Sequence, residues 1–282
     1  MGQKRSVLRR VLHRIRHEVM WQPVGKPRYD SEAPCAEGTC FKAPAGVGEW
    51  YPPAAVGASL VGERSCQPEC ARSVLEVMRK LEPDDYVRYL IGFYEAGLRG
   101  PLGWRYSDIT TVLLAAAQML RPRHYLEIGV RRGRSLAMVA SVQQDCEIVG
   151  FDMWVENYGG MENPGPAFVR AELAKLGFRG KLELVNGNSH CTLKRYFREH
   201  PEAYFDLMTV DGDHSRRGAS LDLRDVLPRL KVGGMIVFDD VAHPDTAYLA
   251  RVWRRYVADD VRFSAWEFRD LGFGIALGVR RF

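Results

Sequence analysis

Length, composition and charge are those of an ordinary globular protein. The chain has 282 residues, 46% hydrophobic and 27% charged, which is long enough for one large domain with an appendage. Residues 1–20 hold six Lys or Arg against one acid, and this excess accounts for the whole formal net charge of +5. The remaining chain is neutral and lacks the charge of a polyanion-binding protein, so we expect no nucleic-acid partner.

Hydropathy indicates the compartment. No segment reaches the ~18 consecutive apolar residues that a membrane span needs. The basic N-terminus carries charges throughout residues 9–16, so it lacks the continuous apolar stretch of a signal peptide. We expect a cytoplasmic protein without a transmembrane segment, with its six cysteines reduced or bound to metal.

Residues 5–20 have the pattern of a basic amphipathic helix. Apolar residues recur on one helical face, and arginines and histidines occupy the others. Such a helix commonly packs on its own core or on a second subunit, and we therefore expect a homo-oligomer. Peripheral contact with an anionic membrane surface is the alternative.

Residues 22–72 lose this periodicity and are rich in Pro and Gly, so we interpret residues 1–72 as a helical and irregular extension. The segment contains a Cys-x4-Cys pair and a Cys-x3-Cys pair: Cys35, Cys40, Cys66 and Cys70. Two such pairs could form a tetrahedral thiolate site for structural Zn²⁺. Free thiols in a loosely packed segment are the alternative, and an iron–sulfur cluster is a third.

Residues 73–121 are predicted to be a helical lead-in. We expect one helix over 73–81, a second over 84–98, and a long third helix through Leu120 with Ser107 as its N-cap. Pro122 ends the third helix and opens the main domain, residues 122–282.

The main domain begins with a stretch that predicts a buried strand, a tight glycine loop and a helix. Gly129 and Gly133 mark places where the backbone turns sharply and a ligand can approach closely. Glu127 stands near the carboxyl end of the strand, where open parallel sheets bind ligands. The spacing Glu-x-Gly-x-x-x-Gly differs from the dinucleotide motif Gly-x-Gly-x-x-Gly, and it favours a cofactor whose amino group and ribose need a carboxylate.

A second predicted strand, 147–152, ends in Asp152, which is suitably placed for two ribose hydroxyls. The two stretches resemble motif I and the following acidic residue of class I S-adenosylmethionine-dependent methyltransferases. This resemblance implies an α/β, Rossmann-like sheet, mostly parallel with a terminal antiparallel hairpin. It implies cofactor contacts from Glu127, Gly129, Gly133, Ser135 and Asp152.

A long loop rich in aromatic residues and glycine, 153–166, follows and is typical of a lid or binding loop. A helix over 168–176 and a strand over 182–185 are expected next. Asn188 and Ser189 follow that strand and are placed to hydrogen-bond the edge of the cofactor's adenine. His190 is more simply explained as a helix-cap or surface histidine.

The elements expected after this point are a strand over 205–210, a helix over 218–227, a turn over 228–234, a strand over 235–239, a helix over 246–257 and a hairpin of 263–268 with 274–279. The strand over 205–210 is followed by Asp211-Gly-Asp213-His214, and the next strand ends in Asp239-Asp240. Because adjacent parallel strands share an edge, Asp211 should lie close to Asp239 and Asp240. An all-oxygen set of this kind suits Mg²⁺ or a similar divalent cation.

This double acidic motif resembles the metal-dependent natural-product and sugar O-methyltransferases, over roughly residues 105–282. The resemblance implies that Asp211, Asp239 and Asp240 are metal ligands, that Asp211 also lies beside the cofactor, and that His214, or failing that Asp213, is the general base. A metal and a base together would deprotonate a hydroxyl that is otherwise too weakly acidic to attack a sulfonium. The structural alternative is that Asp213 caps the next helix and that Asp239 and Asp240 bind loop backbone.

The sequence therefore predicts an S-adenosylmethionine-dependent, Mg²⁺-assisted O-methyltransferase that acts on a hydroxyl of a small natural product or saccharide. A non-catalytic module that binds cofactor or a partner protein on the same fold is the alternative. The sequence carries no readable code for the acceptor.

Overall fold

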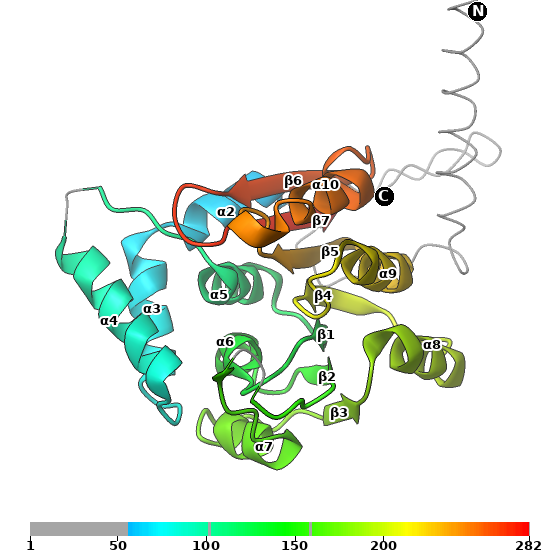
Figure 1. Ribbon diagram of the computed structural model, residues 1–282, viewed down its shortest axis with the longest axis horizontal. Coiled ribbons are helices and arrows are strands. Elements are labelled where there is room, and N and C mark those ends of the chain that lie inside the picture. Colours follow the sequence, from blue (N-terminus) through cyan, green and yellow to red (C-terminus); the bar gives the residue numbers. More distant parts are fainter. Residues whose placement is uncertain (1–55, 101–102, 158–159, 282) are drawn as a thin grey trace, which may run out of the picture.

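A seven-stranded sheet between two layers of helices forms the body of the protein (Figure 1). The computed structural model describes residues 56–100, 103–157 and 160–281. In the strand order β3-β2-β1-β4-β5-β7-β6, β1 to β5 run parallel and β7 is antiparallel to both β5 and β6. The strands are β1 (His124–Ile128), β2 (Glu147–Asp152), β3 (Leu182–Asn186), β4 (Phe205–Val210), β5 (Leu230–Asp239), β6 (Phe263–Phe268) and β7 (Ile275–Arg280). This is the predicted Rossmann-like arrangement with its terminal antiparallel hairpin.

Helices cover both faces of the sheet (Figure 1). Those on one face are α2 (Ala58–Ser65), α3 (Pro68–Met78), α4 (Asp85–Arg99), α5 (Ile109–Leu120), α6 (Arg134–Val142) and α7 (Pro166–Ala174). Those on the other face are α8 (Ser189–Glu199), α9 (Arg216–Val226) and α10 (Leu249–Trp253). None of the described helices is long and apolar enough to cross a membrane.

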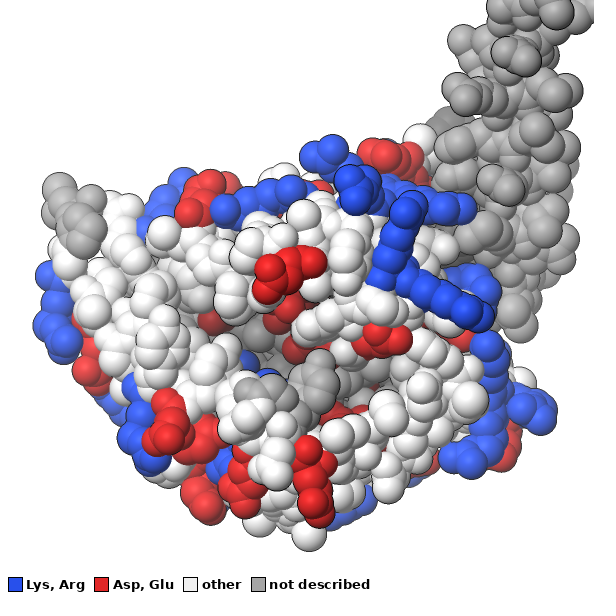
Figure 2. All heavy atoms as spheres, in the orientation of Figure 1, with Lys and Arg blue, Asp and Glu red and all other residues white. Residues whose placement is uncertain are grey.

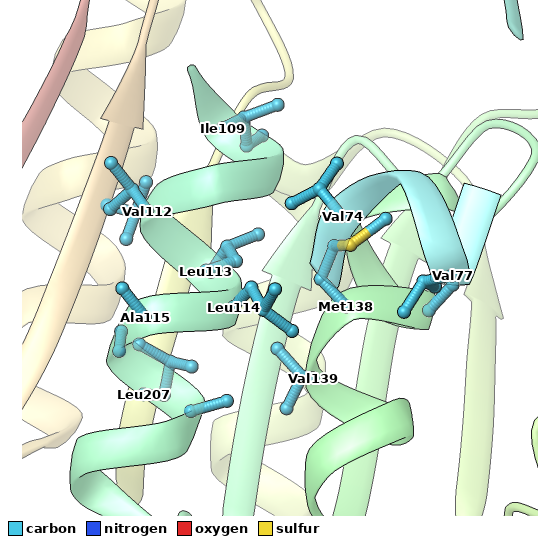
Figure 3. Packing of buried hydrophobic residues seen from close by; sticks show 14 of the residues in the cluster. Val74, Val77, Ile109, Val112, Leu113, Leu114, Ala115, Met138, Val139 and Leu207 are labelled. Atoms are coloured by element: carbon cyan, nitrogen blue, oxygen red, sulfur yellow. The ribbon is translucent and has the colours of Figure 1, made fainter. Parts of the chain in front are cut away.

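Side chains along the central strands alternate between two core layers. On β4, Leu207 joins the layer beneath α3, α5 and α6, whereas Met208 and Val210 join the layer beneath α8 to α10. Figure 3 shows Leu207 in one buried cluster with Leu114 of α5 and Val139 of α6. Burial on both faces explains why these strands appear in the sequence as continuous apolar runs.

The order of the strands determines where a ligand can bind. β1 lies between β2 and β4, so the chain reverses direction across the sheet at the β1–β4 boundary. In open α/β sheets, ligands bind outside the carboxyl ends of the strands at such a switch point. The glycine loop after β1 and the acidic residues after β4 meet there.

Strand β5 begins at Leu230, so the turn predicted over 228–234 was wrong. Phe205 pairs with Leu230 and Leu207 pairs with Met235, which means that β5 accommodates additional residues between these two pairs. Gly233 lies within this irregularity and has φ +80°. The glycines therefore bend a continuous strand instead of ending it.

Helix α2 was not predicted, because its segment was interpreted as irregular, and α3 begins at Pro68 and not at residue 73. Gly62 allows α2 to lie directly on the ring of Trp266 in β6, since a Cβ at this position would be only 2.1 Å from that ring. Tertiary packing thus stabilises a helix whose local sequence signal is weak.

The N-cap of α5 is Asp108 and not Ser107. The Asp108 side chain accepts the N–H groups of Thr110 and Thr111 in a capping box, while Ser107 is buried and shares a hydrogen bond with the hydroxyl of Ser65.

The helix predicted over 246–257 is also broken, into a 3₁₀ turn, α10 and a π-helical turn over Arg254–Ala258. The basic helix predicted over 5–20 lies outside the described residues.

Candidate active site

A cavity of about 260 Å³, here called the edge cavity, opens at the carboxyl edge of the sheet. It is lined by the glycine loop after β1, the loop after β2, the start of α8 and the loop after β4. The predicted site residues that line it are Gly129, Asp152, Asn188, Ser189, Asp211, Asp213 and His214.

Gly129 is required by the close crossing of two loops. Its φ is +94°, and a Cβ at this position would lie 1.9 Å from the carbonyl oxygen of Asp211. Gly133 also has a positive φ and begins α6. The glycine loop can therefore bring its backbone close to both the edge cavity and the β4 loop.

Glu127 and Ser135 lie behind this loop and do not line the edge cavity. Glu127 is completely buried and accepts hydrogen bonds from the Tyr125 hydroxyl and from Ser135 Oγ, the latter at 2.7 Å. Burial raises the pKa of Glu127 to about 8, although these two hydrogen bonds oppose the shift. The hydrogen bond between Ser135 and Glu127 thus links the start of α6 to β1 behind the glycine loop.

Asp152 is held rigidly at the end of β2. One carboxylate oxygen accepts the N–H of Arg131 at 2.7 Å, and the other accepts the N–H of Trp154 at 2.6 Å. This carboxylate thus links the glycine loop to the loop after β2 while lining the edge cavity. Each oxygen retains a lone pair for a ligand hydroxyl.

The start of α8 forms the opposite wall of the edge cavity. Asn188 caps α8 by accepting the N–H of His190, and Ser189 Oγ donates to Asp222 Oδ1 at 2.7 Å. His190, interpreted from the sequence as a surface or capping residue, lines the edge cavity, and its Nε2 lies 3.5 Å from Asp222.

Asp222 itself was missed by the sequence analysis. It is completely buried on α9, and burial raises its pKa to about 6. The available signal was a carboxylate on the apolar face of the helix, between the core residues Ala219 and Val226.

The carboxyl ends of β4 and β5 bring together an Asp–His–Asp cluster made of Asp211, His214 and Asp240. One potential ligand atom from each lies within 4.8 Å of the others. His214 Nε2 is 3.1 Å from Asp211 Oδ1, and His214 Nδ1 is 3.3 Å from Asp240 Oδ2. Asp239 was predicted as a metal ligand beside Asp211 and Asp240, but the grouping within 4.8 Å contains His214 in its place.

Excess negative charge characterises this part of the site. Burial raises the pKa of Asp239 well above its ordinary value, and the neighbouring Asp211 and Asp240 raise it further. Burial and Asp211 likewise raise the pKa of Asp240, while hydrogen bonding to Asp211 raises that of His214. Carboxylates that raise one another's pKa form an environment in which a bound cation would relieve the repulsion.

Asp213 is not a member of the Asp–His–Asp cluster. Its Oδ1 accepts the N–H of Ser215, and its Oδ2 lies 3.7 Å from His190 Nε2. Asp213 therefore stabilises the approach to α9, whose N-cap is Ser215.

The zinc prediction stays a prediction, because Cys35 and Cys40 lie outside the described residues. Cys66 and Cys70 are buried free thiols, and Cys70 Sγ donates to the Thr111 carbonyl at 3.4 Å. Burial raises the pKa of Cys70 to about 12, which favours the neutral thiol over the thiolate that zinc binds.

Part of this chain is similar to a known protein family. Residues 126–241 match the family model described as a methyltransferase domain. The match extends from β1 to just beyond β5 and includes both the glycine loop and the Asp–His–Asp cluster. No curated protein sequence matches the chain.

Solved structures with the same fold include an O-methyltransferase from Bacillus cereus in complex with S-adenosylhomocysteine. It is 18% identical with a TM-score of 0.51, and the match covers 76% of this chain and 100% of that one. TomG of Streptomyces achromogenes, an O-methyltransferase of tomaymycin synthesis, is 18% identical with a TM-score of 0.48 and coverages of 80% and 97%. CalS11, a TDP-rhamnose 3'-O-methyltransferase of calicheamicin biosynthesis, is 20% identical with a TM-score of 0.48 and coverages of 76% and 93%.

Proposed function

We propose that this protein transfers a methyl group from S-adenosylmethionine to a hydroxyl of a small natural product or saccharide, with assistance from Mg²⁺ or a similar divalent cation. The observation that carries the proposal is that Asp211 and His214 belong both to the wall of the edge cavity and to the Asp–His–Asp cluster. A cofactor in the cavity and a cation at the cluster would therefore be neighbours, as methyl transfer to an activated hydroxyl requires.

The residues of the edge cavity suit S-adenosylmethionine, which would supply a methyl group on a positively charged sulfur. Asp152 can accept hydrogen bonds from the two ribose hydroxyls, because its position is fixed by two backbone N–H groups. Ile128, Phe151, Met153 and Val155 give the cavity an apolar lining. The carboxylate of Asp211 adds a negative charge that suits a cationic cofactor.

The Asp–His–Asp cluster suits a hard cation. Asp211 and Asp240 would hold Mg²⁺, and the cation would lower the pKa of the acceptor hydroxyl. His214 is the base in this proposal, because an imidazole between two carboxylates is well placed to take the hydroxyl proton and to be stabilised as the imidazolium.

The test is calorimetric titration of MgCl₂ into protein saturated with S-adenosylhomocysteine. We expect Asp240→Asn to weaken Mg²⁺ binding at least tenfold, because it removes a ligand charge. The matched control is Asp245→Asn, which changes an exposed carboxylate in the same loop and should have no effect. Equal Mg²⁺ affinity in the wild type and in Asp240→Asn would contradict the proposed metal site.

A further inference from the structure

Some of the exposed apolar side chains lie beside this site. Among the described residues, seven large hydrophobic side chains are strongly exposed: Leu60, Tyr89, Met153, Val155, Val261, Leu271 and Phe273. Met153 and Val155 line the edge cavity, where a cofactor would cover them. Tyr89, Leu271 and Phe273 do not line it, and these three are called the apolar rim.

One part of the apolar rim is connected to the glycine loop through α4. Arg132 of the glycine loop forms an ion pair with Asp84, the N-cap of α4, with Nε and Oδ2 3.3 Å apart. The guanidinium of Arg134 lies 4.6 Å from the ring centre of Tyr86, and Tyr86 in turn stacks on Tyr89 at 6.5 Å. A row of planar groups thus runs outward from the start of α6 to Tyr89, which is 66% exposed.

The other part of the apolar rim adjoins the Asp–His–Asp cluster. His243 follows Asp240 by three residues and packs on Phe273, with ring centres 4.3 Å apart. The Phe273 carbonyl accepts the N–H of Ala242 at 2.7 Å, which fixes the β6–β7 turn beside this loop. Phe273 is nevertheless 54% exposed. Apolar surface therefore borders the reaction edge on both the α4 side and the β6–β7 side.

The charges on this side do not favour a polyanionic acceptor. Burial raises the pKa values of Tyr86 and Tyr106; the nearby Arg134 lowers that of Tyr86, whereas Asp108 and Asp239 raise both. Arg132 is engaged by Asp84 and by Glu162. In Figure 2, Asp and Glu atoms lie among uncharged atoms around the central hollow, and most Lys and Arg lie toward the outline of the molecule.

We infer that the acceptor is an uncharged amphiphile, in which a hydroxyl to be methylated is carried on a lipophilic body that covers Tyr89 and Phe273. The inference rests on the proposed function and specifies its substrate class. Exposed aromatic side chains on both sides of a reaction centre supply binding energy through apolar burial. A sugar bearing a diphosphate would need cationic side chains, and Arg132 is already paired with Asp84 and Glu162.

The experiment measures binding of methyl, hexyl and octyl β-D-glucoside, below their micelle concentrations, to protein saturated with S-adenosylhomocysteine and Mg²⁺. UDP-glucose is the charged comparison. Affinity should rise by up to about fourfold for each methylene that becomes buried, so the octyl compound should bind at least tenfold more tightly than the methyl compound. UDP-glucose should bind more weakly than octyl glucoside.

Variants identify the surface that is responsible. Tyr89→Ser and Phe273→Ser should each weaken octyl glucoside at least fivefold and leave S-adenosylhomocysteine affinity unchanged. Val261→Ser is the matched control, because Val261 is 75% exposed but precedes β6, at the opposite edge of the sheet. The inference is overturned if chain length has no effect, if UDP-glucose binds more tightly, or if Val261→Ser weakens binding as much as Phe273→Ser. Failure of the wild type to bind S-adenosylhomocysteine would instead contradict the proposed function.

Discussion

His214 lies between two carboxylates, and its role as base or as metal ligand can be separated by one substitution. We expect His214→Asn to lower the rate of methyl transfer by about 10²–10⁴, because a general base is lost. Mg²⁺ affinity should change by less than about threefold, since Asp211 and Asp240 remain. The two quantities are measured by single-turnover transfer and by calorimetry. Loss of Mg²⁺ binding as severe as in Asp240→Asn would identify His214 as a ligand.

Glu127 makes stability depend on pH. Burial raises its pKa from 4.5 to about 8. Between these two pH values, Glu127 keeps its proton in the folded protein and loses it in the unfolded chain. The contribution of this group to stability is therefore present at low pH and is lost as pH rises from about 4.5 to about 8. Glu127→Gln removes the ionisation, and its melting temperature relative to wild type should rise by several degrees between pH 5 and pH 8.

The control for that measurement is Glu156→Gln, which changes an exposed carboxylate in the loop after β2. Its melting temperature should follow the wild type at every pH. Parallel melting curves for wild type and Glu127→Gln across the same pH range would show that Glu127 is ionised in the folded protein.

Individual site residues were predictable where they follow a strand directly. Asp152 and Asp211 could be placed because the carboxyl ends of parallel strands meet at one edge. The sequence predicted Asp239 beside Asp211 and Asp240, whereas the three potential ligand atoms within 4.8 Å of one another come from Asp211, His214 and Asp240. This difference could not be predicted, because it depends on which way the chain turns after β5. At that turn Asp240 has φ +62°, a local conformation that no spacing rule indicates.

At the level of elements, the glycine loop is the most sensitive connection. Gly129→Ala should abolish S-adenosylhomocysteine binding and destabilise the fold, since the new Cβ would lie 1.9 Å from a backbone oxygen of Asp211 and φ is +94°. Gly92→Ala is the control, because Gly92 lies within α4 with nothing within 4 Å of the added Cβ. This control should raise the free energy of unfolding by about 0.5–1 kcal/mol. Calorimetric titration and urea unfolding measure the two effects, and normal cofactor binding by Gly129→Ala would contradict the account of the loop.

The strands were easier to predict than the helix boundaries. Buried parallel strands leave unbroken apolar runs, and each of β2 to β4 was found within one residue of its predicted position. The turn predicted before β5 was wrong because a glycine pair favours a turn locally, whereas pairing with Phe205 keeps the segment in the sheet. Helix α2 was missed because its stability comes from contact with Trp266, which lies about two hundred residues further along the chain.

At the scale of the whole molecule, the sheet concentrates the candidate chemistry at one edge. The glycine loop, the edge cavity and the Asp–His–Asp cluster all follow the carboxyl ends of β1 to β5, and the apolar rim borders the same edge. The fold class was predictable, since alternating strands and helices with a final hairpin allow few arrangements. The apolar rim was not, because α4 and the β6–β7 turn meet the site only in the folded protein.

The central claim is that this fold holds a methyl-donor cofactor beside a divalent cation. It is tested most directly by calorimetric titration of S-adenosylhomocysteine into the full-length protein, first with EDTA and then with saturating Mg²⁺. We predict micromolar binding in both conditions and a separate Mg²⁺ heat that is lost in Asp240→Asn. Absence of S-adenosylhomocysteine binding in either condition would contradict the claim and leave the glycine loop with a structural role alone.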